Sequence, residues 1–150
     1  MSKNELQTFF VFIQFPYYIY RMEQLVIQGT EKTPEINFDA TSGKLSVGGR
    51  SYSSDAFDFY KPINEWLNKY IQNPNELTIL EINVDYFHSV SVKYLTSIVR
   101  KVAQIQELGK SIKIVWIHQS DENDEDESYE LGKGIESEAK IKFDYVEIAK

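Results

Sequence analysis

A hydroxyl-rich segment that follows an apolar run is the first feature with chemical potential. After the apolar run Leu77–Val84 and Asp85, the chain reads Tyr86-Phe87-His88-Ser89-Val90-Ser91. This order predicts a junction between a strand and a helix, where the first backbone N–H groups lack partners and the helix dipole is positive. A hydroxyl at that point is exposed and lies where a phosphate can be held. The segment is a candidate phosphorylation switch, since a phosphate adds about 1.5 to 2 negative charges.

The same serines have a plainer interpretation. A serine before a helix is most often an N-cap, worth about 1 kcal/mol of helix stability. Ser89 or Ser91 can cap a helix that the apolar periodicity places over roughly residues 91–108. The residue types alone do not decide between a phosphorylation switch and a helix cap.

Two histidines offer an alternative function. His88 and His118 stand near the C-terminal ends of two predicted strands, and paired imidazoles can bind a metal or activate a serine. A small hydrolase that uses His88, Ser89 and His118 would need these groups to converge within hydrogen-bond reach. Histidines at strand ends are also common as surface or capping residues. The chain also has no Gly-rich phosphate-binding loop. We therefore predict that it binds no metal and no cofactor.

The charge of the 150-residue chain lies in one segment. The net charge is −7, and seven acidic residues fall between Asp121 and Glu130. Without them, 23 − 7 = 16 acidic residues balance 16 Lys and Arg. A neutral body with one acidic segment argues against binding to nucleic acid. The segment is either a solvated loop or a contact for a partner with a basic patch.

The N-terminal residues differ from the rest of the chain. Phe9–Tyr20 is apolar, aromatic and interrupted by Pro16, and it is too short to span a bilayer. We expect one domain over residues 22–150 that starts at Met22, with residues 1–21 as an extension outside it. The alternative is a membrane-tethered adaptor that uses residues 9–20 as an interfacial anchor. The chain has no cysteine, which fits a reducing cytoplasm and excludes disulfides and cysteine nucleophiles.

Hydrophobic periodicity predicts an α/β domain, a single mixed β-sheet with helices packed on it. A helix beginning near Asp55 is expected to be capped by Ser53 or Ser54 and to bend or break at Pro62. The acidic segment is expected to run into a short, weak helix broken by Gly132 and Gly134. Gly109 should end the helix over 91–108. The predicted strands cover residues 24–28, 35–40, 44–48, 77–87, 112–118 and 140–148.

From Met22 to about Ile148 the chain resembles the SiaC family of bacterial regulatory phosphoproteins. The order and spacing of the matching segments fit that family, and the acidic segment follows the last of them. The matching segments are Thr33-Pro34-Glu35-Ile36-Asn37-Phe38-Asp39, Gly49-Arg50-Ser51-Tyr52, Phe59-Tyr60-Lys61-Pro62, Glu65-Trp66-Leu67, Tyr86-Phe87-His88-Ser89-Val90-Ser91-Val92-Lys93 and Trp116.

This resemblance implies a STAS-like fold, similar to that of anti-sigma-factor antagonists, and a non-catalytic role in cytoplasmic partner switching. It implies a dedicated kinase, a PP2C-type phosphatase and an effector, such as a diguanylate cyclase, that binds the unmodified form. The family's acceptor lies in a motif resembling N-T-S-S, which falls on Ser89. His88 and Val90 depart from that motif, so Ser91 is kept as second choice. The residues expected to bind a partner are His88, Ser91, Tyr94, Ser97, Arg100 and Lys101.

Overall fold

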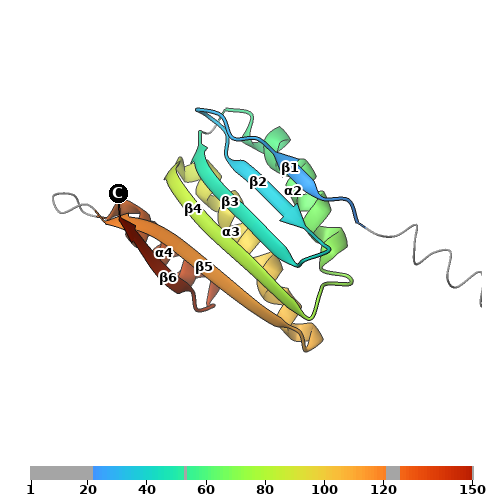
Figure 1. The fold of residues 1–150 in the computed structure, drawn as a ribbon. Helices are drawn as coiled ribbons and strands as arrows, with labels where there is room; N and C mark the ends of the chain where they lie inside the picture. Colours follow the sequence, from blue (N-terminus) through green and yellow to red (C-terminus); the bar gives the residue numbers. More distant parts are fainter. Residues whose placement is uncertain (1–21, 53, 121–125, 150) are drawn as a thin grey trace, which may run out of the picture.

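The computed structural model describes residues 22–52, 54–120 and 126–149. Six strands form one mixed sheet in which each strand lies beside its neighbour in the sequence (Figure 1). The β1–β2 and β2–β3 pairs are antiparallel, and the other three pairs are parallel. The predicted mixed sheet with packed helices is confirmed. The elements are β1 (Leu25–Ile27), β2 (Glu35–Asp39), β3 (Lys44–Ser51), α2 (Ala56–Tyr70), β4 (Leu77–Phe87), α3 (Ser89–Ala103), the 3-10 helix η1 (Gln104–Leu108), β5 (Ser111–Ser120), α4 (Glu127–Ala139) and β6 (Asp144–Ala149).

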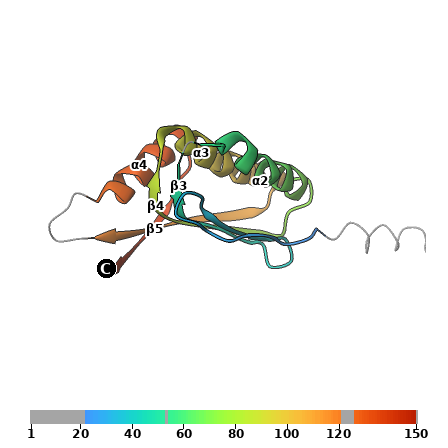
Figure 2. The same ribbon diagram turned by 90° about the horizontal axis from the view of Figure 1, so that it is seen from above.

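The helices α2, α3 and α4 all cover the same face of the sheet (Figure 2). Each of them connects two adjacent parallel strands, and such crossovers are almost always right-handed. Because the three crossovers step in the same direction across the sheet, a single hand places every helix on one side. The three helices therefore begin at the same end of the sheet, where the parallel strands have their C-termini. The predicted switch lies at that end.

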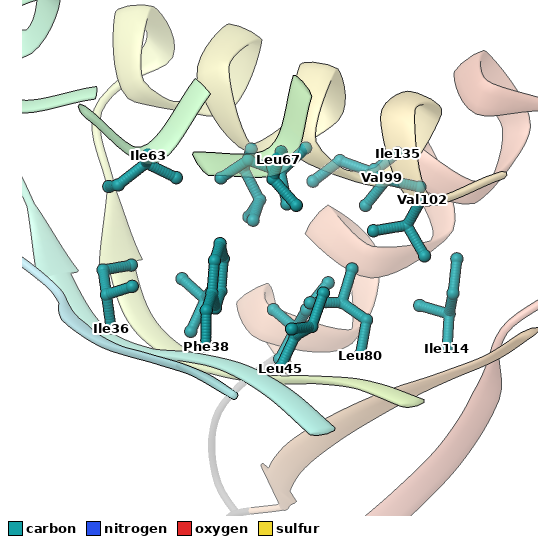
Figure 3. Packing of buried hydrophobic residues seen from close by; sticks show 14 of the residues in the cluster. Ile36, Phe38, Leu45, Ile63, Leu67, Leu80, Val99, Val102, Ile114 and Ile135 are labelled. Atoms are coloured by element: carbon teal, nitrogen blue, oxygen red, sulfur yellow. The ribbon is translucent and has the colours of Figure 1, made fainter. Parts of the chain in front are cut away.

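The core lies between this helix layer and the sheet (Figure 3). Strand residues alternate, so that in β2 Ile36 and Phe38 are buried while Glu35 and Asn37 are exposed. In the helices, apolar residues recur every three or four positions and face the sheet. The buried residues that meet there include Ile63, Leu67, Leu80, Leu95, Val99, Val102, Ile114 and Ile135.

Helix α2 differs from the prediction at its start and at Pro62. Its N-cap is Asp55, which has a left-handed φ of 54° and makes no side-chain cap bond. Ser54 therefore does not cap the helix, and Ser53 lies outside the described residues. The expected break at Pro62 is also absent, because α2 continues through it. Pro62 and Asp58 are exposed, so the carbonyl of Asp58 that loses its helical donor can be hydrated.

The other helices also differ from the predicted bounds. Helix α3 begins two residues earlier than expected, and its predicted last turn is η1. Gly109 ends it with a φ of 77°, as predicted. Helix α4 is continuous, so the expected break at Gly132 and Gly134 is wrong. A Cβ on Gly132 would lie 2.7 Å from Cε2 of Trp116, so this glycine allows close packing. Lys140 ends α4, and the last strand starts only at Asp144.

Candidate functional site

The predicted switch segment lies where β4 ends and α3 begins. Ser51 of β3 pairs with Phe87 of β4, and the backbone N–H of His88 donates to the carbonyl of Ser51 at 2.9 Å. His88 is extended, with a ψ of 152°, and its Nδ1 accepts from the N–H of Val90 at 3.4 Å. Because β3 holds His88 extended, the helix can start at Ser89. The N-cap predicted at Ser89 or Ser91 is therefore His88.

The two serines of the junction lie in different environments. Ser89 is the first residue of α3 and is exposed, and its Oγ lies 3.5 Å from Nδ1 of His88. Ser91 is 0% exposed, and its Oγ accepts a hydrogen bond of 2.7 Å from Oγ of Ser51. Ser91 was expected to contact a partner, but it has no exposed surface for one. The prediction that Ser91 binds a partner is therefore wrong for the folded chain.

A buried hydroxyl cluster, Ser51, Tyr60 and Ser91, lies beneath this junction. The phenol of Tyr60 is 2.8 Å from Oγ of Ser51, and Tyr60 is 1% exposed. Burial raises the pKa of Tyr60 to about 12, although its bonds to Ser51 and Ser91 act in the other direction. The ring of Tyr60 stacks on Tyr94 of α3, with the ring centroids 4.6 Å apart. The cluster therefore joins β3, α2 and α3.

The N-terminus of α3 carries no compensating negative charge. Its first turn has no acidic residue, whereas α2 has Asp58 there and α4 has Glu127 and Glu130. Acidic groups in the first turn of a helix are stabilising because they oppose the positive end of its dipole. An anion on Ser89 would therefore be stabilised by the positive end of this helix dipole, which no acidic side chain of the first turn neutralises.

Exposed apolar side chains occur where β3 and β4 end and where α2 and α3 begin. We call Tyr52, Phe57, Tyr86 and Val90 the apolar patch. Tyr52 follows the last residue of β3, and Tyr86 is the second-last residue of β4. Their ring centroids are 5.2 Å apart. Phe57, which is 68% exposed, and Val90 lie in the first turns of α2 and α3. None of these four residues was among the predicted docking residues, because the exposure of an apolar side chain depends on tertiary packing that the local pattern does not show.

The remaining predicted docking residues lie along α3 and mostly contact neighbouring helices. Tyr94 is half-buried against Tyr60, and Ser97 is half-buried. The guanidinium of Arg100 donates to Oε1 of Glu138 in α4 at 3.3 Å. Nζ of Lys101 donates to Asn64 of α2 at 3.3 Å, and partial burial lowers the pKa of that ammonium. Arg100 and Lys101 therefore help to join the three helices.

The groups of the predicted hydrolase are not brought together. Nδ1 of His118 lies 2.5 Å from Oδ2 of Asp126, and its ring contacts Tyr129 of α4. The hydrogen bonds of His88 join it to Ser51, Ser89, Val90 and Val92. Within the described part of the chain, no hydrogen bond or ring contact joins His118 to His88 or Ser89. No three metal-ligating side chains cluster among these residues either.

Part of the acidic segment has a structural role. Residues 121–125 lie outside the described residues, but Asp126 is the N-cap of α4 and accepts from the N–H of Tyr129 at 2.9 Å. Glu127 and Glu130 occupy the first turn of this helix, where they oppose its dipole. The expected contact with a basic partner stays a prediction.

The N-terminal expectations cannot be placed on this structure. The described residues include no helix that is both long enough and apolar enough to cross a bilayer. Residues 9–20 and the extension 1–21 lie outside the described residues. The proposed anchor and the start at Met22 therefore stay predictions.

Comparisons with known proteins agree on one family. A model of SiaC family regulatory phosphoproteins matches residues 27–148. An uncharacterized protein of Pseudomonas aeruginosa strain UCBPP-PA14 is 24% identical over 95 residues, which are 63% of this chain and 75% of that protein. SiaC of Pseudomonas aeruginosa superposes with a TM-score of 0.71 at 21% identity, covering 86% of this chain and 100% of that one.

A crystal structure of the diguanylate cyclase SiaD in complex with its activator SiaC, also from Pseudomonas aeruginosa, gives a similar match. The TM-score is 0.71 at 21% identity, covering 84% of this chain and 99% of that one. Both structural matches support the fold, while the likeness to anti-sigma-factor antagonists stays a prediction. The family model covers most of the sequence, and on that ground the chain belongs to the SiaC family of regulatory phosphoproteins.

Proposed function

We propose that this chain is a non-catalytic regulatory phosphoprotein of a partner-switching system. Its unphosphorylated form binds an effector protein, such as a diguanylate cyclase, and phosphorylation of Ser89 blocks that binding. A dedicated kinase adds the phosphate and a PP2C-type phosphatase removes it. Membership of a family of regulatory phosphoproteins and the SiaD–SiaC complex support this function. The absence of cysteine fits the cytoplasm as the place of action.

One observation carries the proposal. Of the two hydroxyls at the junction, Ser89 is exposed and Ser91 is fully buried. A kinase must reach the hydroxyl oxygen, so the difference in exposure favours Ser89 as the acceptor. The apolar patch lies at the same end of the sheet, where β3 and β4 end. The modification would therefore lie close to the surface best suited to bind a partner.

The mechanism is electrostatic. In the free protein a phosphate on Ser89 is stabilised at the N-terminus of α3, where the first turn contains no other anion. A partner seated on the apolar patch would have to remove water from that dianion without supplying a matching charge. Desolvating an unpaired charge costs several kcal/mol, which is enough to abolish a moderate affinity.

The docking surface is proposed to consist of the apolar patch with its neighbours His88 and Tyr94. Large exposed apolar groups, aromatic ones above all, mark protein interfaces. Ser97, Arg100 and Lys101 extend this surface along α3, and their contacts with α2 and α4 are expected to make them weaker contributors.

The test is titration of the purified chain with purified diguanylate cyclases from the same cells. Ser89→Ala should bind like the unmodified protein, whereas Ser89→Asp should bind at least about tenfold more weakly, which is 1.4 kcal/mol. Ser111→Asp is the matched control, since Ser111 is an exposed serine at the start of β5. Phosphosite mapping after incubation with the cognate kinase should identify Ser89. Equal binding by Ser89→Asp and Ser89→Ala would contradict the proposed switch.

A further inference from the structure

The proposed function requires that the hydroxyl of residue 89 is held outward in one orientation. Building on that function, we propose that Ser51 is the positioning residue for Ser89, acting through the hydrogen-bonded chain Tyr60–Ser51–Ser91. Neither Ser51 nor Tyr60 is modified or contacts a partner in this scheme. Both act on Ser89 through the backbone on either side of it.

Ser51 binds the chain on both sides of Ser89. Its carbonyl accepts from the N–H of His88, and its Oγ donates to Oγ of Ser91. The distances are 2.9 Å and 2.7 Å. Residues 88 and 91 are thus fixed to one residue at the end of β3, and the segment between them must turn outward. This geometry accounts for the exposure of Ser89 beside a fully buried Ser91.

The hydrogens of the cluster have a defined order. Oγ of Ser51 donates its one proton to Ser91, so it must accept from the phenol of Tyr60. Burial raises the pKa of Tyr60 to about 12, so the phenol keeps the proton that this order requires it to donate. Because every member is buried, a lost partner would leave a polar atom unsatisfied and would not be replaced by water at no cost.

Tyr60 lies in α2, so this helix also helps to position Ser89. Tyr60 stacks on Tyr94, which lies one turn beyond Ser91 on the same helix, with an interplanar angle of 6°. Helix α3 is therefore held at two successive turns, by the hydroxyl of Ser91 and by the ring of Tyr94. A second phenol–hydroxyl pair, Tyr70 with Thr78, is equally buried and lies 2.6 Å apart. Among the described residues, no hydrogen bond or ring contact joins this pair to the junction, so it provides a matched control.

The chain contains no cysteine, so Ser89→Cys can carry a single nitroxide label that reports on this position by electron paramagnetic resonance. In this background, Ser51→Ala and Tyr60→Phe should each make the label more mobile. Tyr70→Phe should leave the label spectrum unchanged while lowering the melting temperature by a similar amount. In the unlabelled chain, amide exchange at residues 89–92 should accelerate about three- to tenfold for Ser51→Ala and Tyr60→Phe only.

Three results would overturn the positioning role: an unchanged label in Ser51→Ala, an equal change in Tyr70→Phe, or fully additive effects of Ser51→Ala and Tyr60→Phe. Additivity would mean that the two residues do not act as one chain. These measurements need no effector. If the label responds as expected but Ser89→Asp binds the cyclase normally, the proposed function fails and the positioning stands. If Ser89→Asp blocks binding but the label does not respond, only the positioning fails.

Discussion

Ser51 and Ser91 are 40 residues apart in the sequence, and their Oγ atoms share a hydrogen bond of 2.7 Å inside the core. Both side chains are closed to solvent, with exposed fractions of 2% and 0%. Such polar groups are tolerated in a core only when they satisfy each other. This contact makes the second serine of the junction a part of the core, and the consequences of substitution at the two serines should differ sharply.

A carboxylate at position 91 should strongly destabilise the fold, whereas one at position 89 should not. Ser91→Asp buries an unpaired charge beside Ser51 and Tyr60, which should reduce the free energy of unfolding by at least about 3 kcal/mol. Ser89→Asp places the same charge in solvent. Urea denaturation followed by circular dichroism measures both values. Equal stability of the two variants would show that Ser91 is accessible after all.

Ser89→Asp should in fact stabilise the fold at low ionic strength. The carboxylate would lie in the first turn of α3, which has no other acidic residue, and such a charge contributes about 0.3 to 1 kcal/mol. The gain should shrink as salt screens the interaction. Thermal unfolding at low and high NaCl, with Ser89→Asn as the uncharged control, measures the effect. A gain that is the same at both salt concentrations would argue against the dipole.

The sequence predicts the elements better than their ends. Strand β4 matches its predicted range because its apolar run and the helix after it are strong local signals. The N-cap of α3 could not be predicted, because His88 is held extended by a bond to Ser51 on another strand. The burial of Ser91 has the same distant cause. The exposure of Ser89 was predicted, since a hydroxyl at a strand–helix junction is a local feature.

Gly132 and Gly134 were interpreted alike from the sequence, and they should respond in opposite ways to alanine. A Cβ at Gly132 would meet the indole of Trp116 at 2.7 Å, so Gly132→Ala should destabilise the fold by about 1 to 3 kcal/mol. A Cβ at Gly134 meets no atom within 4 Å, so Gly134→Ala should stabilise it by up to about 1 kcal/mol. Urea denaturation of the two variants provides the comparison. Similar shifts of the same sign would mean that α4 does not pack on Trp116.

Tyr60 should make the stability fall at alkaline pH. The pKa of Tyr60 is raised from 10.0 to about 12 in the folded chain, chiefly by burial. Between these values the unfolded chain has lost the phenol proton and the folded chain keeps it, so raising the pH favours unfolding. The loss should approach 1.4 kcal/mol per pH unit inside this window, and Tyr60 should contribute no pH dependence below about pH 9.

Comparison with Tyr60→Phe isolates this effect, because the other tyrosines and lysines titrate in both proteins. Burial also raises the pKa of Tyr145, but that contribution is common to the two chains and cancels. The difference in unfolding free energy between wild type and Tyr60→Phe should be constant up to about pH 9 and then change in favour of the variant towards about pH 12. A constant difference across the whole range would mean that the phenol is hydrated in the folded chain. In that case Tyr60 could not serve as the fixed donor to Ser51, and the positioning of Ser89 would lose its connection to α2.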